Sequence, residues 1–197
     1  LAIDYAVWIA FSQISEPEVR LHSIDFDQNV VISINKELTK GEGWSEYLKG
    51  LIKIFKHSKS KIFGWKGIIA GNVPIGAGLS SSAALTLALT RVFAKVSNLD
   101  WDPRQMARIC QLAENQWVGV NCGIMDQMIS ASGQEDHVTL IDCRSLKTTP
   151  VPLPEEVRVV ILDTYTRRGL VDSAYNERRK QCESVASYFG KKTLRDV

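Results

Sequence analysis

Hydrophobic residues along the chain follow two spacings, and these spacings predict its secondary structure. Alternating or short continuous apolar runs predict strands, whereas an i, i+3, i+4 spacing predicts helices. The expected strands are 1–12, 19–25, 29–34, 65–72, 137–143 and 157–164. The expected helices are 41–57, 81–96, 103–119 and 172–189, with a further short helix inside 119–133.

Two helices have distinct sequence signals. Asp102 followed by Pro103 is typical of an N-cap and the first helical position. In the last helix an amphipathic pattern predicts one shared face, made of Tyr175, Arg178, Cys182, Val185, Ala186 and Phe189.

The proline-rich stretch 148–156, TTPVPLPEE, is the best candidate for a domain boundary. We therefore expect a first domain at 1–153 and a second that begins at 154 and is incomplete at 197. The N-terminal residues LAIDYAVWIAF have neither the length of a membrane span nor the basic start of a signal peptide. We interpret them as a strand cut from a longer chain.

Composition narrows the classes of function. Lys and Arg total 24 against 22 acidic residues, a net charge of +2, so no basic footprint for nucleic acid is present. The four cysteines are widely spaced without a Cys-x-x-Cys pair, which favours reduced thiols over disulfides or a zinc site. These features favour a cytoplasmic globular protein without a membrane partner.

The stretch 71–84, GNVPIGAGLSSSAA, places glycines and three serines between an expected strand and an expected helix. Unpaired amides at a helix N-terminus attract anions, and glycines let the backbone approach phosphate oxygens. The alternative is structural: Ser80–Ser82 as helix caps, and Gly76 and Gly78 as turn residues. The segment lacks the lysine of GxxxxGK[ST] and is not GxGxxG, so neither of those nucleotide motifs is present.

PIGAGLSSSAA resembles the second motif of the GHMP kinases, Pro-x-x-x-Gly-Leu-x-Ser-Ser-Ala. Three further stretches resemble the galactokinase branch of that superfamily: WSEYLKG at 44–50, CGIMDQMIS at 122–130 and RRGLVDSAYNERRKQCE at 167–183. The resemblance covers nearly the whole chain. It implies an α+β, two-lobed GHMP kinase fold, with an N-terminal domain like ribosomal protein S5 and the start of a ferredoxin-like C-terminal domain.

The same resemblance implies ATP and Mg²⁺ as cofactors and transfer of a phosphoryl group to the anomeric hydroxyl of galactose. The implied phosphate-binding residues are Gly76, Ala77, Gly78, Leu79, Ser80, Ser81 and Ser82. Glu114, eight residues before Cys122, is similar to the family's metal-binding glutamate, and Ser82 would be its partner ligand.

The galactokinase resemblance further implies that Asp126 is the catalytic residue, either a general base or an electrostatic positioner for the sugar's anomeric hydroxyl. A lone Asp between Met125 and Met128 is costly to bury without a partner, so a nearby cation should keep it ionised. Its alternative is a capping or salt-bridged Asp. Gly123 and Tyr175 resemble sugar-binding residues and Trp44 resembles an aromatic near adenine, although helical spacing makes Trp44 and Tyr175 equally good core residues.

Some galactokinase features are not in this sequence. These are the opening Arg and Gly-Glu-His-x-Asp-Tyr signature and the Gly-rich third motif, so we expect an internal fragment with little activity alone. Arg167-Arg168 stands where many relatives have a basic-His pair. We expect a monomeric protein that acts on a small molecule, galactose. The alternatives to a partial galactokinase are a kinase for another sugar, such as N-acetylgalactosamine or arabinose, and a non-catalytic galactose and ATP sensor.

Overall fold

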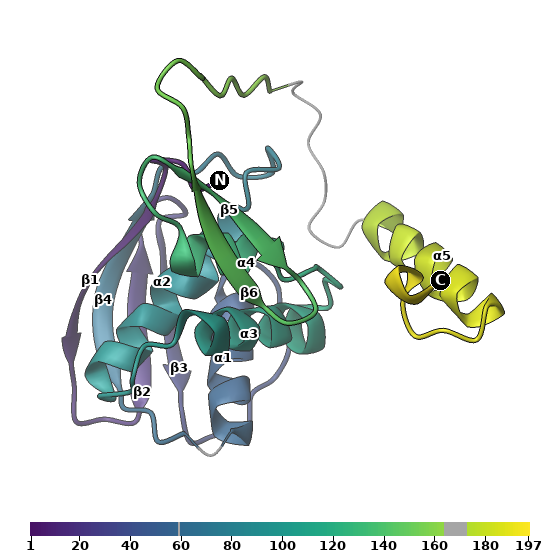
Figure 1. The fold of residues 1–197 in the computed structure, drawn as a ribbon. Helices are drawn as coiled ribbons and strands as arrows, with labels where there is room; N and C mark the ends of the chain where they lie inside the picture. The colour runs from purple at the N-terminus through teal and green to yellow at the C-terminus, as the bar shows by residue number, and fades with distance from the viewer. Residues whose placement is uncertain (59, 164–172) are drawn as a thin grey trace.

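A four-stranded mixed sheet with helices on one face forms most of the computed structural model (Figure 1). The structure describes residues 1–58, 60–163 and 173–197, without the side chains of 173–175. The strand order is β1-β4-β2-β3, with β4 and β2 parallel and the other two pairs antiparallel. The strands are β1 (Val7–Gln13), β2 (Glu18–Ser23), β3 (Gln28–Ser33) and β4 (Trp65–Gly71).

The helices and a separate hairpin complete the fold. The remaining elements are α1 (Ser45–His57), α2 (Ser81–Val96), α3 (Pro103–Ala113), the π-helical turn η1 (Glu114–Val118), α4 (Met125–Ser132), β5 (His137–Asp142), β6 (Lys147–Pro152), α5 (Ser173–Tyr188) and the 3-10 turn η2 (Leu194–Asp196). None of the helices in the described residues is both long and apolar enough to cross a membrane.

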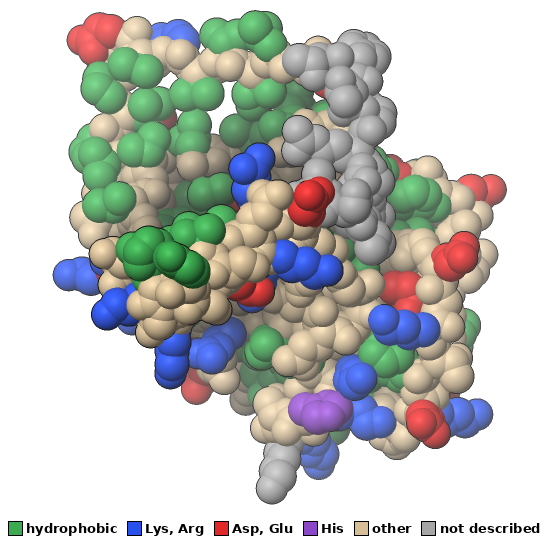
Figure 2. Space-filling model, turned by 90° about the vertical axis from the view of Figure 1, so that its right-hand side faces the viewer, with side chains coloured by type: hydrophobic (Ala, Val, Ile, Leu, Met, Phe, Trp, Pro, Cys, Tyr) green, Lys and Arg blue, Asp and Glu red, His purple; other side chains and the backbone are tan. Residues whose placement is uncertain are grey.

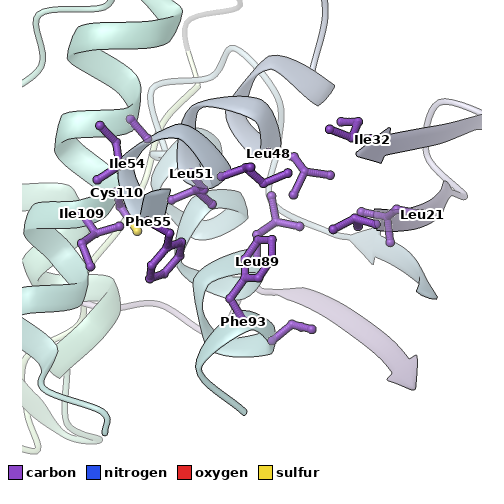
Figure 3. Packing of buried hydrophobic residues seen from close by; sticks show 14 of the residues in the cluster. Leu21, Ile32, Leu48, Leu51, Ile54, Phe55, Leu89, Phe93, Ile109 and Cys110 are labelled. Carbon is purple, nitrogen blue, oxygen red and sulfur yellow. The ribbon is translucent and has the colours of Figure 1, made fainter. Parts of the chain in front are cut away.

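The core lies between the sheet and α1, α2 and α3. In β2, Val19 and Leu21 are buried while Arg20 between them is exposed, which is the alternation of a sheet with one covered face. Phe93 of α2 is at the centre, 5.5 Å from the ring of Phe55 in α1 and 5.8 Å from the ring of Trp65 in β4. Figure 3 shows side chains from the strands and the helices converging in this cluster.

The first expected strand is shorter in the structure, where β1 begins at Val7. Its partner β4 ends at Gly71, opposite Val7, so residues before Val7 have no strand to pair with. Asn72 closes the ladder: its Oδ1 accepts from Ala6 N at 2.7 Å, and its own amide donates to Ala6 O at 3.1 Å. The segment 1–6 is thereby fixed beside the start of the 72–80 loop.

The expected strand at 157–164 was wrong over its described part. Residues 157–163 form no regular secondary structure and are all exposed, because no strand among the described residues pairs with them. Residues 157–163 have the composition of a buried strand, but strand pairing depends on the tertiary structure.

Part of the proline-rich stretch 148–156 forms a strand. In the described residues β6 pairs with β5 alone, and an edge strand tolerates Pro150 and Pro152. The division at 153 and 154 stays a prediction.

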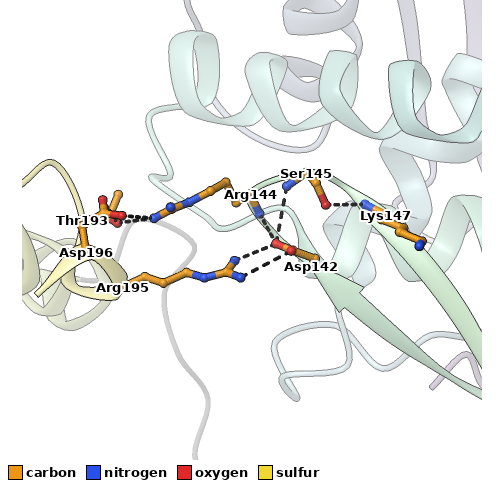
Figure 4. A network of polar contacts seen from close by, with 7 residues as sticks. All are labelled: Asp142, Arg144, Ser145, Lys147, Thr193, Arg195 and Asp196. Carbon is orange, nitrogen blue, oxygen red and sulfur yellow. Dashed lines mark hydrogen bonds and ion pairs between the residues drawn. The ribbon is translucent and has the colours of Figure 1, made fainter.

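The last helix lies to one side of the main body (Figure 1). Of its expected apolar face, Ala186 is buried and Cys182 half-buried, whereas Val185 and Phe189 are exposed. Tyr175 falls outside the described side chains. The C-terminal segment after α5 is attached by charge: Arg195 Nη1 donates to Asp142 Oδ1 at 2.7 Å, and Arg144 Nη2 to Asp196 Oδ1 at 2.6 Å (Figure 4).

The attachment of the C-terminal segment should depend on pH. The Arg195 hydrogen bond holds the pKa of Asp142 far below its ordinary value of 3.8. The stabilisation is therefore complete above that ordinary value and is lost as the pH falls toward the folded-state pKa. We expect amide hydrogen exchange at 186–197 to be faster in Asp142→Asn than in the wild type at pH 6, and the difference to shrink below pH 4. Equal exchange of the two proteins at pH 6 would contradict this attachment.

Candidate functional site

The 72–80 loop reaches α2 through three residues in the left-handed region. Gly76, Gly78 and Ser80 have φ values of 72°, 77° and 59°. A Cβ added at Gly78 would meet no atom within 4 Å, so its surroundings are open and the requirement for glycine is one of backbone conformation. The sequence prediction of a tight Gly-rich connection before the helix is confirmed.

The N-terminus of α2 is not closed by its own cap residue. Ser80 occupies the N-cap position in the left-handed conformation, and its side chain makes no capping hydrogen bond. Its carbonyl accepts from Ala84 N at 3.1 Å and so starts the helical ladder. The first amides of a 16-residue helix are thus not capped by Ser80, and the structure does not support the interpretation of Ser80 as a simple side-chain cap. Such an N-terminus attracts anions.

Glu114 lies at the point where α3 widens into the π-helical turn η1. Gly119 N donates to Glu114 O at 2.8 Å, an i to i+5 bond, and Gly119 then ends the turn with a φ of 98°. Single π turns inside helices often occur at functional sites. The sequence predicts one continuous helix over 103–119, and the extent of this helix is confirmed. The sequence did not predict that its last turn is a π turn, which holds one more residue than an α-helical turn.

The Glu114 carboxylate is 1% exposed and is surrounded by polar groups from other helices. Gln127 Nε2 donates to Glu114 Oε1 at 2.9 Å, and Thr86 Oγ1 lies 3.4 Å from the same oxygen. The Cys122 thiol lies 3.9 Å from Oε2. Burial raises the pKa of Glu114, hydrogen bonds from Gln127, Ser82 and Thr86 lower it, and the charge of Asp126 raises it further.

Ser82 lies near Glu114, and its role as a partner ligand for a cation stays a prediction. Its side chain interacts with Glu114 on one side and with the Tyr47 hydroxyl on the other. Burial raises the pKa of Tyr47, and the negative charge of Glu114 raises it further. Among the described residues, no group completes a well-formed hydrogen bond to Tyr47 Oη or to Gln127 Oε1, although both atoms are buried.

This donor set is compatible with a small hard cation. Mg²⁺ binds oxygen, commonly through one or two protein groups with water and phosphate completing the shell. The Glu114 carboxylate and the Ser82 hydroxyl are such ligands, and the two unsatisfied oxygens beside them leave hydrogen-bonding capacity for water. Within the described ranges no three His, Cys, Asp or Glu residues gather into a metal site.

Asp126 lies in the first turn of α4 and is half-buried. Together with Gly78, Leu79 and Ser80 it lines a cavity of about 640 Å³. The floor is mainly apolar, formed by residues of α2, α4 and β5 together with 1–7 and two residues of 157–163. Figure 2 shows this side of the molecule, where hydrophobic side chains border a hollow near the top of the view.

The cavity contains one acidic and one basic residue among the described residues that line it, Asp126 and Arg91. The Arg91 guanidinium lies 4.5 Å from the centre of the Trp101 ring. No ion pair joins Asp126 to any residue that the structure describes, so the expected cation next to it is not part of these ranges. The predicted capping or salt-bridged role for Asp126 is likewise not seen there.

The other predicted site residues lie in different places. Gly123 lies in the loop before α4. It is exposed, and it takes part in a non-covalent interaction. Trp44 is 8% exposed, stacks on Phe26 with 6.3 Å between ring centres, and donates its indole N–H to Gln28. It does not line the cavity, and its role near adenine stays a prediction. The side chain of Tyr175 and both Arg167 and Arg168 lie outside the described residues.

Sequence reasoning missed Tyr47, Thr86 and Gln127 as parts of the site. Tyr47 and Thr86 fall within helices that the hydrophobic pattern assigns to the core. Gln127 had a signal, because it directly follows Asp126 in an apolar stretch. A buried glutamine, like a buried aspartate, needs a partner.

Residues 46–134 match the family model of the GHMP kinases N terminal domain. This range contains the 72–80 loop, Glu114 and Asp126. Over this range the chain is similar to the N-terminal domain of the GHMP kinases.

Solved structures agree with this fold. The galactokinase of Lactococcus lactis, determined in complex with galactose, is 28% identical and has a TM-score of 0.85. The match covers 99% of this chain and 53% of that one, so the chain spans about half the length of the lactococcal enzyme. The α+β GHMP kinase fold expected from the sequence is thereby confirmed.

More distant kinases share the fold alone. The mevalonate kinase of Methanococcus jannaschii is 18% identical with a TM-score of 0.56, over 65% of this chain and 42% of that one. A D-glycero-D-manno-heptose 1-phosphate kinase from Bacteroides thetaiotaomicron is 15% identical with a TM-score of 0.61, over 77% of this chain and 49% of that one.

The reactivity of the Cys122 thiol, which lies beside Glu114, should report how well this region is shielded from solvent. Burial raises the pKa of the half-buried Cys122 to about 11 and that of the buried Cys110 to about 12, whereas Cys143 is exposed. Because the thiolate is the reactive form, we expect N-ethylmaleimide at pH 7.5 to label Cys143 first, Cys122 much later and Cys110 last. Peptide mass spectrometry measures the order, and labelling in guanidinium chloride is the control. Labelling of Cys122 as fast as Cys143 would show that Glu114 is open to solvent.

Proposed function

We propose that this chain provides the nucleotide-binding and catalytic-carboxylate part of a galactokinase. The reaction is transfer of the terminal phosphoryl group of ATP to the anomeric hydroxyl of galactose. One observation carries the proposal: Gly78, Leu79 and Ser80, at the open N-terminus of α2, line the same cavity as Asp126. An anion-binding backbone and an acidic side chain thus border one space.

The backbone of 76–82 holds the phosphates in this proposal. Phosphoryl transfer depends mainly on positioning and on charge stabilisation, and both are supplied by amides that are already fixed before the ligand arrives. The left-handed residues Gly76, Gly78 and Ser80 set the direction of these amides, and the dipole of α2 adds partial positive charge. Trp44 and Tyr175 keep their predicted roles near adenine and the sugar.

Ser82 and Glu114 are the residues that would hold Mg²⁺. When bound, this cation neutralises negative charge on the phosphates. The protein's own contribution is to orient the Glu114 carboxylate through hydrogen bonds from Gln127, Ser82 and Thr86, which oppose the larger effect of burial in raising its pKa.

Asp126 acts on the sugar hydroxyl. As a base, its carboxylate accepts the proton of the attacking hydroxyl; as a positioner, it accepts a hydrogen bond that directs the hydroxyl oxygen at the phosphorus. In either role it must face the substrate without a competing partner. The absence of an ion pair to Asp126 within the described ranges is consistent with that requirement, and Gly123 would let the sugar approach the backbone.

Replacement of Asp126 by Asn tests the catalytic role. In the natural gene product that contains this chain, we expect Asp126→Asn to lower kcat about 10²- to 10⁴-fold, because proton transfer or alignment is lost. Binding of ATP should stay within a few-fold of the wild type. The measurement is a coupled assay of ADP release with galactose, N-acetylgalactosamine and arabinose, together with calorimetric titration of ATP.

The matched control for this test is Asp136→Asn. Asp136 is an exposed aspartate at a φ of 56°, a conformation that Asn tolerates. It should keep the wild-type rate. Turnover of Asp126→Asn at that same rate would refute the catalytic assignment, and phosphorylation of another sugar in preference to galactose would move the proposal to that sugar.

Gly78→Ala tests the phosphate-binding loop, and Gly190→Ala is its control. Both glycines have a positive φ and open space around an added Cβ, so both substitutions impose a similar backbone cost of about 1–2 kcal/mol. We expect similar losses in melting temperature. Only Gly78→Ala should weaken ADP binding, by about tenfold or more, because relief of the strain displaces the loop amides. Equal ADP affinity in the two variants would place the phosphates elsewhere.

A further inference from the structure

Gln127 is an enclosed polar side chain that the mechanism above leaves without a chemical role of its own. It is 1% exposed, on the first turn of α4 next to Asp126. Asp126 lines the cavity, whereas the Gln127 side chain enters the cluster around Glu114. Consecutive residues of one helical turn therefore serve two different parts of the site.

The contacts of Gln127 define its orientation. Its Nε2 donates to Glu114 Oε1 at 2.9 Å and lies 3.5 Å from Cys122 Sγ. The reverse orientation would place the amide oxygen against a carboxylate oxygen, which is repulsive. The donor end is thus committed to Glu114, and the amide plane fixes the rotation of that carboxylate.

The other end of the same side chain has no partner among the residues that the structure describes. Gln127 Oε1 is buried and receives no hydrogen bond from any residue within the described ranges. Buried polar atoms are rarely left in this state, and an exception requires an explanation. An acceptor next to a carboxylate that holds a hydrated cation would take a hydrogen bond from the water in that cation's shell.

We propose that Gln127 is a positioning residue for the cation site: it fixes the Glu114 carboxylate in the rotation that binds Mg²⁺. The inference rests on the proposed function, since it assigns Glu114 to the cation. Groups that hydrogen-bond to a metal ligand typically influence metal affinity 10- to 100-fold without touching the metal. Because Gln127 and Asp126 are neighbours, the same contact also anchors the turn that carries the catalytic carboxylate.

The test compares Gln127→Met with Gln111→Met. Gln111 also donates its Nε2 within this region, to Cys122 O at 3.2 Å, but among the described residues its side chain makes no hydrogen bond to the Glu114 carboxylate. Both substitutions replace an amide with an apolar side chain of similar length. ADP is titrated calorimetrically at increasing MgCl₂ and also in EDTA, with the natural gene product that contains this chain.

For Gln127→Met we expect the Mg²⁺ concentration that half-restores ADP affinity to rise 10- to 100-fold, with the affinity in EDTA unchanged. Gln111→Met should behave as the wild type in both conditions. A purely structural role would weaken binding in EDTA as well. An unchanged Mg²⁺ requirement in Gln127→Met would overturn the inference and leave the proposed function in place.

A double-mutant cycle with Glu114→Gln tests whether Gln127 acts through Glu114. In the Glu114→Gln background, Gln127→Met should change the Mg²⁺ requirement by less than about twofold; a full additional effect contradicts the inference. If Gln127→Met does not fold, Gln127→Asn, which keeps the amide but is too short to reach Glu114, takes its place with the same expected result. Wild-type protein that binds ADP without any Mg²⁺ dependence would instead refute the proposed cation site, and this inference with it.

Discussion

Burial of the Glu114 carboxylate is the constraint on which the arrangement of the site depends. A charge removed from water is stable only when hydrogen bonds replace its hydration. At Glu114 these come from two helices other than its own, through Ser82 and Thr86 of α2 and Gln127 of α4. These hydrogen bonds therefore connect α2 and α4, the helix of Asp126, through the Glu114 carboxylate.

The π-helical turn provides the place for this carboxylate. A regular helix continued from α3 would rotate the following residues by one position relative to the observed turn. The i to i+5 bond from Gly119 to Glu114 absorbs one residue, and the left-handed Gly119 then turns the chain toward the 120–124 loop. This loop leads directly into α4, so the local irregularity of η1 determines where Asp126 and Gln127 begin their helix.

Much of the fold was predictable from the sequence, because hydrophobic spacing reports the covered face of each element. The helices α1, α2 and α4, the strands β2 to β5 and the Gly-rich connection before α2 were expected within a few residues. The π turn was not, since five residues at π spacing do not change a helical pattern enough to be recognised. Strand pairing was also inaccessible: the run 157–163 has strand-forming residues but no partner strand, and only a partner makes such a run a strand.

Within the site, the sequence identified residues with unusual chemistry and missed those that support them. Asp126 and the serine triplet break the local pattern of their segments, and the proximity of Ser82 to Glu114 followed from a family resemblance. Tyr47 and Thr86 conform to their helices and give no such signal. Their role depends on which helices meet, and this is determined by packing across segments that are far apart in the chain.

The charges in this region also determine what the site requires from its ligands. Asp126 and Glu114 are close enough for the charge of one to raise the pKa of the other, and a nucleotide would add further negative charge beside them. Against this, the described lining of the cavity offers Arg91, whose guanidinium lies over Trp101, and the partial charge of the α2 N-terminus. Helix dipoles and one exposed arginine do not balance two carboxylates and a triphosphate. A polyphosphate bound between the 76–82 loop and Asp126, as proposed above, would therefore need a cation, and Glu114 and Ser82 are the ligands proposed for it.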